Sequence, residues 1–167
     1  MTRKSYSEIN LHFTWHVKDD IPVLRDELET QVHRSLRGQC FEEPGVFFHE
    51  IGGTDDHIHL VVRVPPTLLV SEWVGKLKGS SSHFINHHIA NRKVLEWQAK
   101  YGVVSFGTRD LPWVVDYVRG QRAHHASGKT HERLERTEIE EDGKPAQAGS
   151  GPDITEGGTF PGGPAPA

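Results

Sequence analysis

The fold is decided by residues 46–64, which read VFFHEIGGTDDHIHLVVRV. The runs Val46–Ile51 and His57–Val64 are rich in β-branched and aromatic residues, as strands are. Between them, the segment Gly52–Asp56 holds two glycines and two aspartates, which favour a tight turn. The stretch therefore predicts two strands joined by a hairpin.

On the N-terminal side, the hydropathy pattern predicts a strand and then a helix. In Tyr6–Lys18, apolar residues alternate with polar ones, which is typical of a strand. The turn Asp19–Pro22 follows, and Val23–Gly38 then carries apolar residues at helical spacing, with Gly38 as its expected stop. A strand and a helix therefore precede the hairpin.

The C-terminal side predicts a helix, a strand and a last helix. We expect a helix from Ser71 to about Ala90, a strand over Tyr101–Phe106 and a helix over about Leu111–Ala126. The order β-α-β-β-α-β is that of the ferredoxin-like split βαβ arrangement. We therefore expect an α+β fold, with an antiparallel sheet, helices on one face and an extra C-terminal helix.

Composition divides the chain into a domain over residues 1–127 and a tail over residues 128–167. The domain holds 15 Lys and Arg against 15 Asp and Glu, whereas the tail holds 4 against 8 and is rich in Gly and Pro. We expect most of this tail to be disordered, with a short helical piece through Arg136. The neutral domain argues against non-specific coating of DNA, which needs an excess of Lys and Arg.

Two features bear on the compartment. Cys40 is the single cysteine, so no internal disulfide can form and a reducing compartment is favoured. No segment approaches the length of a membrane helix, and the N-terminus lacks the apolar stretch of a signal peptide. We therefore expect a soluble cytoplasmic protein with no membrane partner.

The histidines of the two predicted strands are candidates for chemistry. His57 and His59 flank one apolar residue, so on a strand both imidazoles face one side and can hold one cation. Asp56 precedes them and is placed to orient a ligand imidazole, although an aspartate also suits the turn. His12 and His16 share a face of the first strand, which leaves contact with nucleic acid open. Exposed polar positions on half-buried strands are the alternative explanation for these histidines.

Tyr117 and Gln121 are four positions apart in the last predicted helix and therefore share a face. Tyrosine is a poor nucleophile at its usual pKa of about 10, but a divalent cation that polarises a phosphodiester makes its attack feasible. The glutamine carbonyl is a hard oxygen donor, which suits Mg²⁺ or Mn²⁺. An exposed pair on an amphipathic helix is the alternative.

Four further residues are candidates for DNA contact or for a supporting role. Arg119 and Arg122 flank the Tyr–Gln pair, and His124 lies one turn beyond it. Lys78 precedes a glycine and three serines that weaken helix propensity. Contact with phosphate and a plain solvated surface both fit these positions.

Five sequence blocks occur together in one order. They are HVK and IPVL within residues 16–24, DHIHLVV at 56–62, PP at 65–66 with LKGSSS at 77–82, Trp97 with YGVVSFG at 101–107, and YVRGQ at 117–121 with HH at 124–125. In these blocks the chain resembles the single-tyrosine HUH transposases of the smallest bacterial insertion sequences, which include the REP-associated tyrosine transposases. The resemblance covers residues 6–125.

The resemblance implies roles for four residues. His57 and His59 would be metal ligands, Gln121 would complete the metal site and Tyr117 would be the nucleophile. In that family the tyrosine attacks a phosphate of single-stranded DNA, keeps the 5′ end as a phosphotyrosine and releases a 3′-hydroxyl. The implied cofactor is Mg²⁺ or Mn²⁺, and DNA hairpins mark the sites of cleavage.

The resemblance also leaves alternatives open. The full set of four residues favours an active DNA transposase, and the alternative is a domesticated protein that binds REP-type hairpins, or nicks them, with little transposition. Family members are homodimers that exchange the tyrosine helix, or monomers, and the sequence does not distinguish these arrangements. The implied location is the bacterial cytoplasm.

Overall fold

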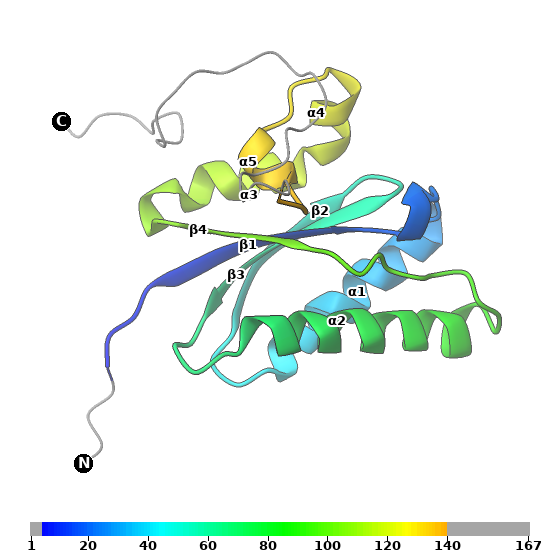
Figure 1. Ribbon diagram of the computed structural model, residues 1–167, viewed down its shortest axis with the longest axis horizontal. Coiled ribbons are helices and arrows are strands. Elements are labelled where there is room, and N and C mark those ends of the chain that lie inside the picture. Colours follow the sequence, from blue (N-terminus) through cyan, green and yellow to red (C-terminus); the bar gives the residue numbers. More distant parts are fainter. Residues whose placement is uncertain (1–4, 140–167) are drawn as a thin grey trace.

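A four-stranded antiparallel sheet lies between two layers of helices in the computed structural model, which describes residues 5–139 (Figure 1). The sheet order is β2-β3-β1-β4. The strands are β1 (Ile9–His16), β2 (Phe47–Gly53), β3 (His57–Val64) and β4 (Gly102–Phe106). The helices are α1 (Asp26–Glu42), α2 (Val70–Phe84), α3 (Leu111–Arg119), α4 (Gln121–Ala126) and α5 (Glu132–Glu135). The predicted α+β, ferredoxin-like arrangement is confirmed.

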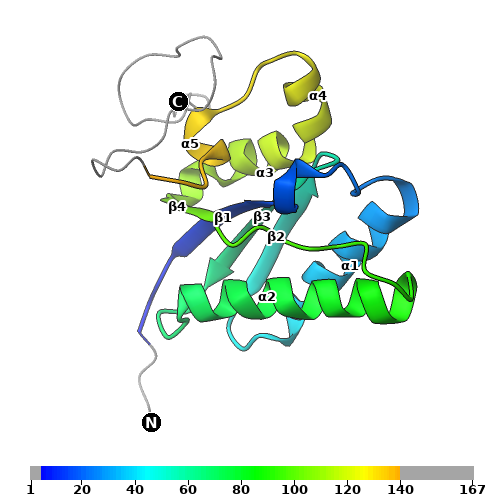
Figure 2. The ribbon, with the colours of Figure 1, turned by 45° about the vertical axis from the view of Figure 1, so that its right-hand side comes forward.

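Both faces of the sheet are covered. Helices α1 and α2 lie against one face, and α3, α4 and α5 lie on the other (Figure 2). In β1, Phe13 faces α1 and α2 and is fully buried, while His12 faces the opposite layer and is 1% exposed. The expectation of exposed polar residues on this face was therefore wrong for β1. The polar face of the sheet is an interior, because the C-terminal helices cover it.

Helix α1 begins and ends later than predicted, at Asp26 and Glu42 rather than at Val23 and Gly38. The buried residues Val32, Leu36 and Cys40 follow one another at four-residue spacing, so the apolar row continues past the glycine. A Cβ added at Gly38 would meet no atom within 4 Å. The glycine therefore sits on the outward side of a helix whose packing outweighs its low propensity.

The thiol of Cys40 is expected to be inert in the folded protein. It is fully buried, and burial raises its pKa to about 12, so almost no reactive thiolate forms at mildly alkaline pH. Reaction with a disulfide reagent such as Ellman's reagent should be undetectable in buffer and should reach one thiol per chain in concentrated guanidinium chloride. Rapid labelling in buffer would show instead that α1 opens readily from the sheet.

One of the unusual serines of helix α2 has a role in packing. Ser81 is fully buried, and its Oγ accepts a hydrogen bond of 2.9 Å from Nε1 of Trp97. Helical structure was expected to about Ala90, and beyond Phe84 it continues as one π-helical turn, Ile85–Ile89. Because α2 lies on the face of the sheet opposite α3, its serines do not approach the His57–His59 pair.

The last predicted helix is broken in two at Gly120, whose φ and ψ of −93° and 19° are not helical. The chain then continues into α5, where Leu134 is fully buried against the sheet. Residues 128–139 were assigned to the tail, so this part of it is folded, including the short helical piece expected through Arg136. Residues 140–167 lie outside the described residues. No helix within residues 5–139 is long and apolar enough to cross a bilayer.

Candidate active site

The imidazoles of His57 and His59 lie side by side on the face of β3 that α3 covers. Their ring centroids are 5.1 Å apart, and the residues are 2% and 0% exposed. The alternation of a strand produces this arrangement, because it points Ile58 into the other core. The two rings therefore share one buried space, as the sequence predicted for a pair that holds a cation.

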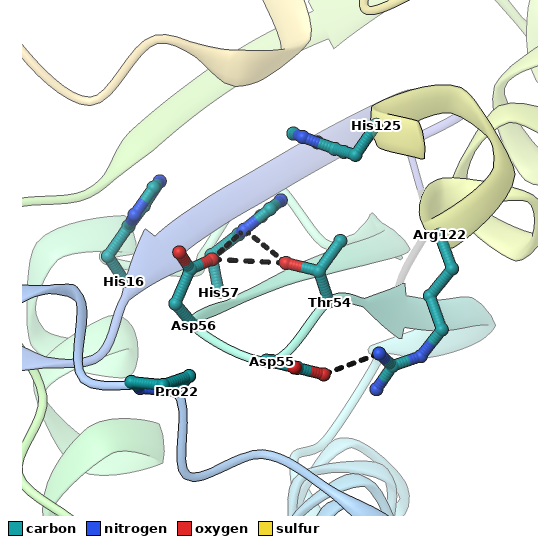
Figure 3. A pocket seen from close by; sticks show the side chains of 8 residues that line it. All are labelled: His16, Pro22, Thr54, Asp55, Asp56, His57, Arg122 and His125. Carbon is teal, nitrogen blue, oxygen red and sulfur yellow. Dashed lines mark hydrogen bonds and ion pairs between the residues drawn. The ribbon is translucent and has the colours of Figure 1, made fainter. Parts of the chain in front are cut away.

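The hairpin before β3 fixes the orientation of His57. Its Nδ1 lies 2.6 Å from an Asp56 oxygen and 2.9 Å from Oγ1 of Thr54 (Figure 3). The hydrogen bond from His57 lowers the pKa of the Asp56 carboxyl to about 2, so this carboxylate stays charged. With Nδ1 bound in this way, Nε2 of His57 points into the buried space, toward Oε1 of Gln121.

His59 is oriented by another histidine. Its Nδ1 lies 2.7 Å from Nε2 of His12, and both residues are fully enclosed. Burial lowers the pKa of both imidazoles, so they are neutral near pH 7, the form in which histidine binds metals. Nε2 of His59 is buried and has no hydrogen-bond partner among the described residues. A buried ring nitrogen without a hydrogen-bond partner fits a metal ligand.

Tyr117 comes from α3 and lies over the histidine pair of its own chain. Its ring meets that of His59 edge-on at 6.1 Å and stacks between Trp113, at 5.6 Å, and His124, at 4.8 Å. Its hydroxyl donates a hydrogen bond of 2.5 Å to Glu135. Burial and the Glu135 carboxylate raise the pKa of this hydroxyl, so it is protonated at rest.

Gln121 begins α4 and reaches the same space. Its Oε1 lies 3.4 Å from Nε2 of His57 and 3.1 Å from Nε2 of His125. Its Nε2 donates to the Tyr117 carbonyl at 3.3 Å, which fixes the oxygen toward the histidines. Although Gly120 separates α3 from α4, the structure brings Gln121 to the two histidines together with Tyr117.

Glu135 was not predicted as a residue of this site, and it lies beside the two histidines together with His125. Glu135, from α5, lies 3.6 Å from Nε2 of His57 and 3.4 Å from Nε2 of His59. His125 is exposed and faces the same carboxylate at 3.4 Å. The four side chains His57, His59, His125 and Glu135 offer ligand atoms within 4.8 Å of one another, as a metal site requires. The lone Leu134 in a charged stretch was the signal for a packed segment here.

The other predicted supporting residues have different neighbours. Lys78 donates to the backbone carbonyls of Gln98 and Lys100, both at 2.9 Å, on the far side of the sheet. Arg119 pairs with Glu50 at 2.9 Å. The structure gives Lys78 a role in holding a loop, and it offers no support for contact of Lys78 with DNA at the histidine pair.

A pocket opens beside His57, and Figure 3 shows its lining. His16 stacks on His57 with ring centroids 4.8 Å apart. Arg122 lines the pocket, where its guanidinium contacts Asp55 at 2.5 Å and also pairs with Glu29. The pocket therefore gives access to the His57 side of the site. The positive charge of Arg122 in its lining is balanced by the carboxylates of Asp55 and Glu29.

The chain matches one known protein family and resembles two solved structures. A family model described as "Transposase IS200 like" matches residues 5–121. A Deinococcus radiodurans R1 protein assigned as a transposase has a structure similar to this one, with 20% identity, a TM-score of 0.59 and coverage of 71% of this chain and 94% of that chain. A REP-associated tyrosine transposase bound to a REP hairpin is 16% identical, with a TM-score of 0.54 and coverage of 78% and 75%. No curated protein matches.

Proposed function

Because the chain belongs to the family of IS200-like transposases, we propose that it is a single-tyrosine enzyme that cleaves and rejoins single-stranded DNA. One observation carries this proposal: Tyr117 and the pair His57 and His59 meet in one buried site, with the Tyr117 ring against His59. A nucleophile beside two neutral imidazoles is the arrangement that metal-assisted phosphodiester cleavage needs.

The residues that would hold the metal are His57 and His59, through Nε2, and Gln121, through Oε1. The carbonyl oxygen is a hard donor that suits Mg²⁺ or Mn²⁺, and three protein donors leave positions open for phosphate oxygens. When bound, the ion would make the phosphorus more electrophilic and offset the charge that develops on the phosphate. Asp56 and His12 keep the two imidazoles in the orientation that this requires.

The proposed reaction keeps the energy of the cleaved phosphodiester bond in a phosphotyrosine bond. The Tyr117 oxygen forms a bond to phosphorus while the bond from phosphorus to the 3′ oxygen breaks, and the departing strand takes up a proton as its 3′-hydroxyl. The hydroxyl of Tyr117 already donates to Glu135, which is placed to accept its proton. Rejoining is the reverse step, in which another 3′-hydroxyl attacks the phosphotyrosine, so no ATP is needed.

For the DNA partner we propose single-stranded hairpins, as in the REP-associated relative that was solved with a REP hairpin. The arginines beside the site, Arg119 and Arg122, are paired with carboxylates, which limits sequence-independent attraction to DNA. Recognition therefore has to come from the shape and bases of a hairpin.

A second candidate is a hairpin-binding protein that cleaves rarely. One observation favours it: Tyr117 is only 4% exposed, and its hydroxyl is held between Glu135 and the backbone N–H of His131. A phosphate can approach this oxygen only if its neighbours move. The two candidates differ in cleavage rate rather than in hairpin binding.

One experiment tests the proposal. The full chain is incubated with single-stranded hairpin oligonucleotides from its own genomic flanks and Mn²⁺ or Mg²⁺, and the products are separated on a denaturing gel. We expect a covalent protein–DNA adduct that carries a label placed at the 3′ end of the oligonucleotide, whereas a 5′ label should appear on a shortened free strand.

Chelation of the metal by EDTA should abolish the adduct without abolishing hairpin binding. Hairpin binding with no adduct on any flanking sequence would contradict cleavage and favour the second candidate. An adduct that retains the 5′ label would contradict the proposed polarity of the phosphotyrosine bond.

A further inference from the structure

Three possible donor atoms from two distant parts of the chain lie close together beside Tyr117. They are Nε2 of His57 and Nε2 of His59, both on β3, and a carboxylate oxygen, Oε2, of Glu135 on α5. This oxygen lies 3.6 Å from the first nitrogen and 3.4 Å from the second. The short helix α5 therefore brings a carboxylate to the histidine pair.

These separations are longer than ordinary hydrogen bonds, in which nitrogen and oxygen are about 2.9–3.0 Å apart. Two donors that each lie about 2.1 Å from one cation are about 3.0 Å apart at octahedral angles and about 3.4 Å apart at tetrahedral angles. The distance from Glu135 to His59 equals the tetrahedral value and the distance to His57 is slightly longer, so a small inward movement of the side chains would bring all three donors to one ion.

The electrostatic surroundings of Glu135 point the same way. Its side chain is 10% exposed, and within residues 5–139 its ion-pair contacts are to histidines, with no Lys or Arg among them. A largely buried carboxylate with no Lys or Arg partner is costly to keep charged, and a divalent cation would supply a balancing charge.

Glu135 is also held in place from both sides. Leu134 is fully buried, and Arg133 donates a hydrogen bond of 2.7 Å to the Ser105 carbonyl on β4. On the other side, the Arg136 carbonyl approaches Gly102 so closely that a Cβ there would lie 1.7 Å from the carbonyl oxygen. A ligand fixed by its neighbours in this way loses little entropy when it binds an ion.

We propose that Glu135 is a carboxylate ligand of the metal that His57 and His59 hold, so that α5 completes the site. This inference rests on the metal site of the proposed function. Two imidazoles and one carboxylate form a donor set that leaves coordination positions for substrate oxygens. The other oxygen of Glu135, Oε1, accepts the Tyr117 hydroxyl at 2.5 Å, so one side chain links the ion to the nucleophile.

The test measures binding of Mn²⁺ alone to the full chain, from the loss of the electron paramagnetic resonance signal of free Mn²⁺. The isosteric change Glu135→Gln should weaken binding at least about tenfold, which is the lower limit for groups that only support a ligand. It should also reduce the rise in melting temperature that Mn²⁺ produces, because that rise follows the affinity. Glu135→Asp, which keeps the charge, should lie between the wild type and Glu135→Gln.

The matched control is Glu132→Gln, on the same helix, whose side chain is 50% exposed and pairs with Arg136. It should bind Mn²⁺ like the wild type. A double change of His57 and His59 to alanine tests the site itself, and unchanged binding there would refute the proposed metal site. If that double variant loses binding while Glu135→Gln binds as well as the wild type, or more tightly, the inference about Glu135 alone is overturned.

Discussion

Replacing Tyr117 with phenylalanine is expected to abolish the covalent protein–DNA adduct and strand transfer, a loss of at least about 1,000-fold. The hydroxyl is the only atom removed, and it is the group proposed to bond to phosphorus. The ring contacts with Trp113, His124 and His59 remain, so the fold should persist. The measurement is adduct yield on a denaturing gel, alongside hairpin binding and thermal unfolding.

The variant loses the hydrogen bond to Glu135 and the one accepted from the backbone N–H of His131, and should therefore lose about 1–2 kcal/mol of stability. Tyr101→Phe is the matched control, since Tyr101 lies near Lys78 on the other face of the sheet. It should form the adduct at the wild-type rate. An adduct of normal yield with Tyr117→Phe would exclude Tyr117 as the nucleophile and would direct attention to another side chain near the histidine pair.

Strand positions could be predicted from the sequence because alternation is local. The hairpin over residues 46–64 and the strands β1 and β4 are found within a few residues of their expected places. Helix ends were less predictable, since they depend on packing. Cys40 extends α1 past Gly38 by filling the core, while Gly120 breaks the last helix, so two glycines in helices had opposite effects.

The site was predictable only in part. His57, His59, Tyr117 and Gln121 could be proposed together because the order of sequence blocks resembles a known family, and the structure brings them into one space. Glu135 could not be found in this way, because its position depends on Leu134 packing against the sheet. A charged segment next to a Gly- and Pro-rich stretch has the composition of a disordered tail, whatever its neighbours in space.

His12 illustrates a second limit. Alternation placed its side chain on the same face as that of His16, and a polar face of a strand is usually exposed. Only the coverage of that face by α3 and α5 makes His12 a buried partner of His59. Whether a sheet carries helices on one face or on both is a tertiary property that periodicity within a strand does not contain.

The contact between β2 and α3 fixes the distance from the nucleophile to the histidines, and Gly52 makes that contact possible. A Cβ added at Gly52 would lie 2.1 Å from the Val118 carbonyl oxygen, far inside any allowed separation. The clashing atom belongs to the backbone, so it cannot rotate away as a side chain would. In Gly52→Ala, α3 must therefore move off the sheet, and Tyr117 must move with its neighbour Val118.

We expect Gly52→Ala to cost about 1–3 kcal/mol of stability, the range for overpacking a well-filled interior. Adduct formation should fall by about 100-fold, because a displacement of about 1 Å at a reacting group has an effect of that order. The measurements are chemical unfolding and the initial rate of adduct formation at a temperature where the variant is folded.

Gly75→Ala is the control, since a Cβ there meets no atom within 4 Å. Because Gly75 is exposed on a helix, this variant should gain up to about 1 kcal/mol of stability. Adduct formation at the wild-type rate by folded Gly52→Ala would mean that the spacing between α3 and β2 does not control attack by Tyr117.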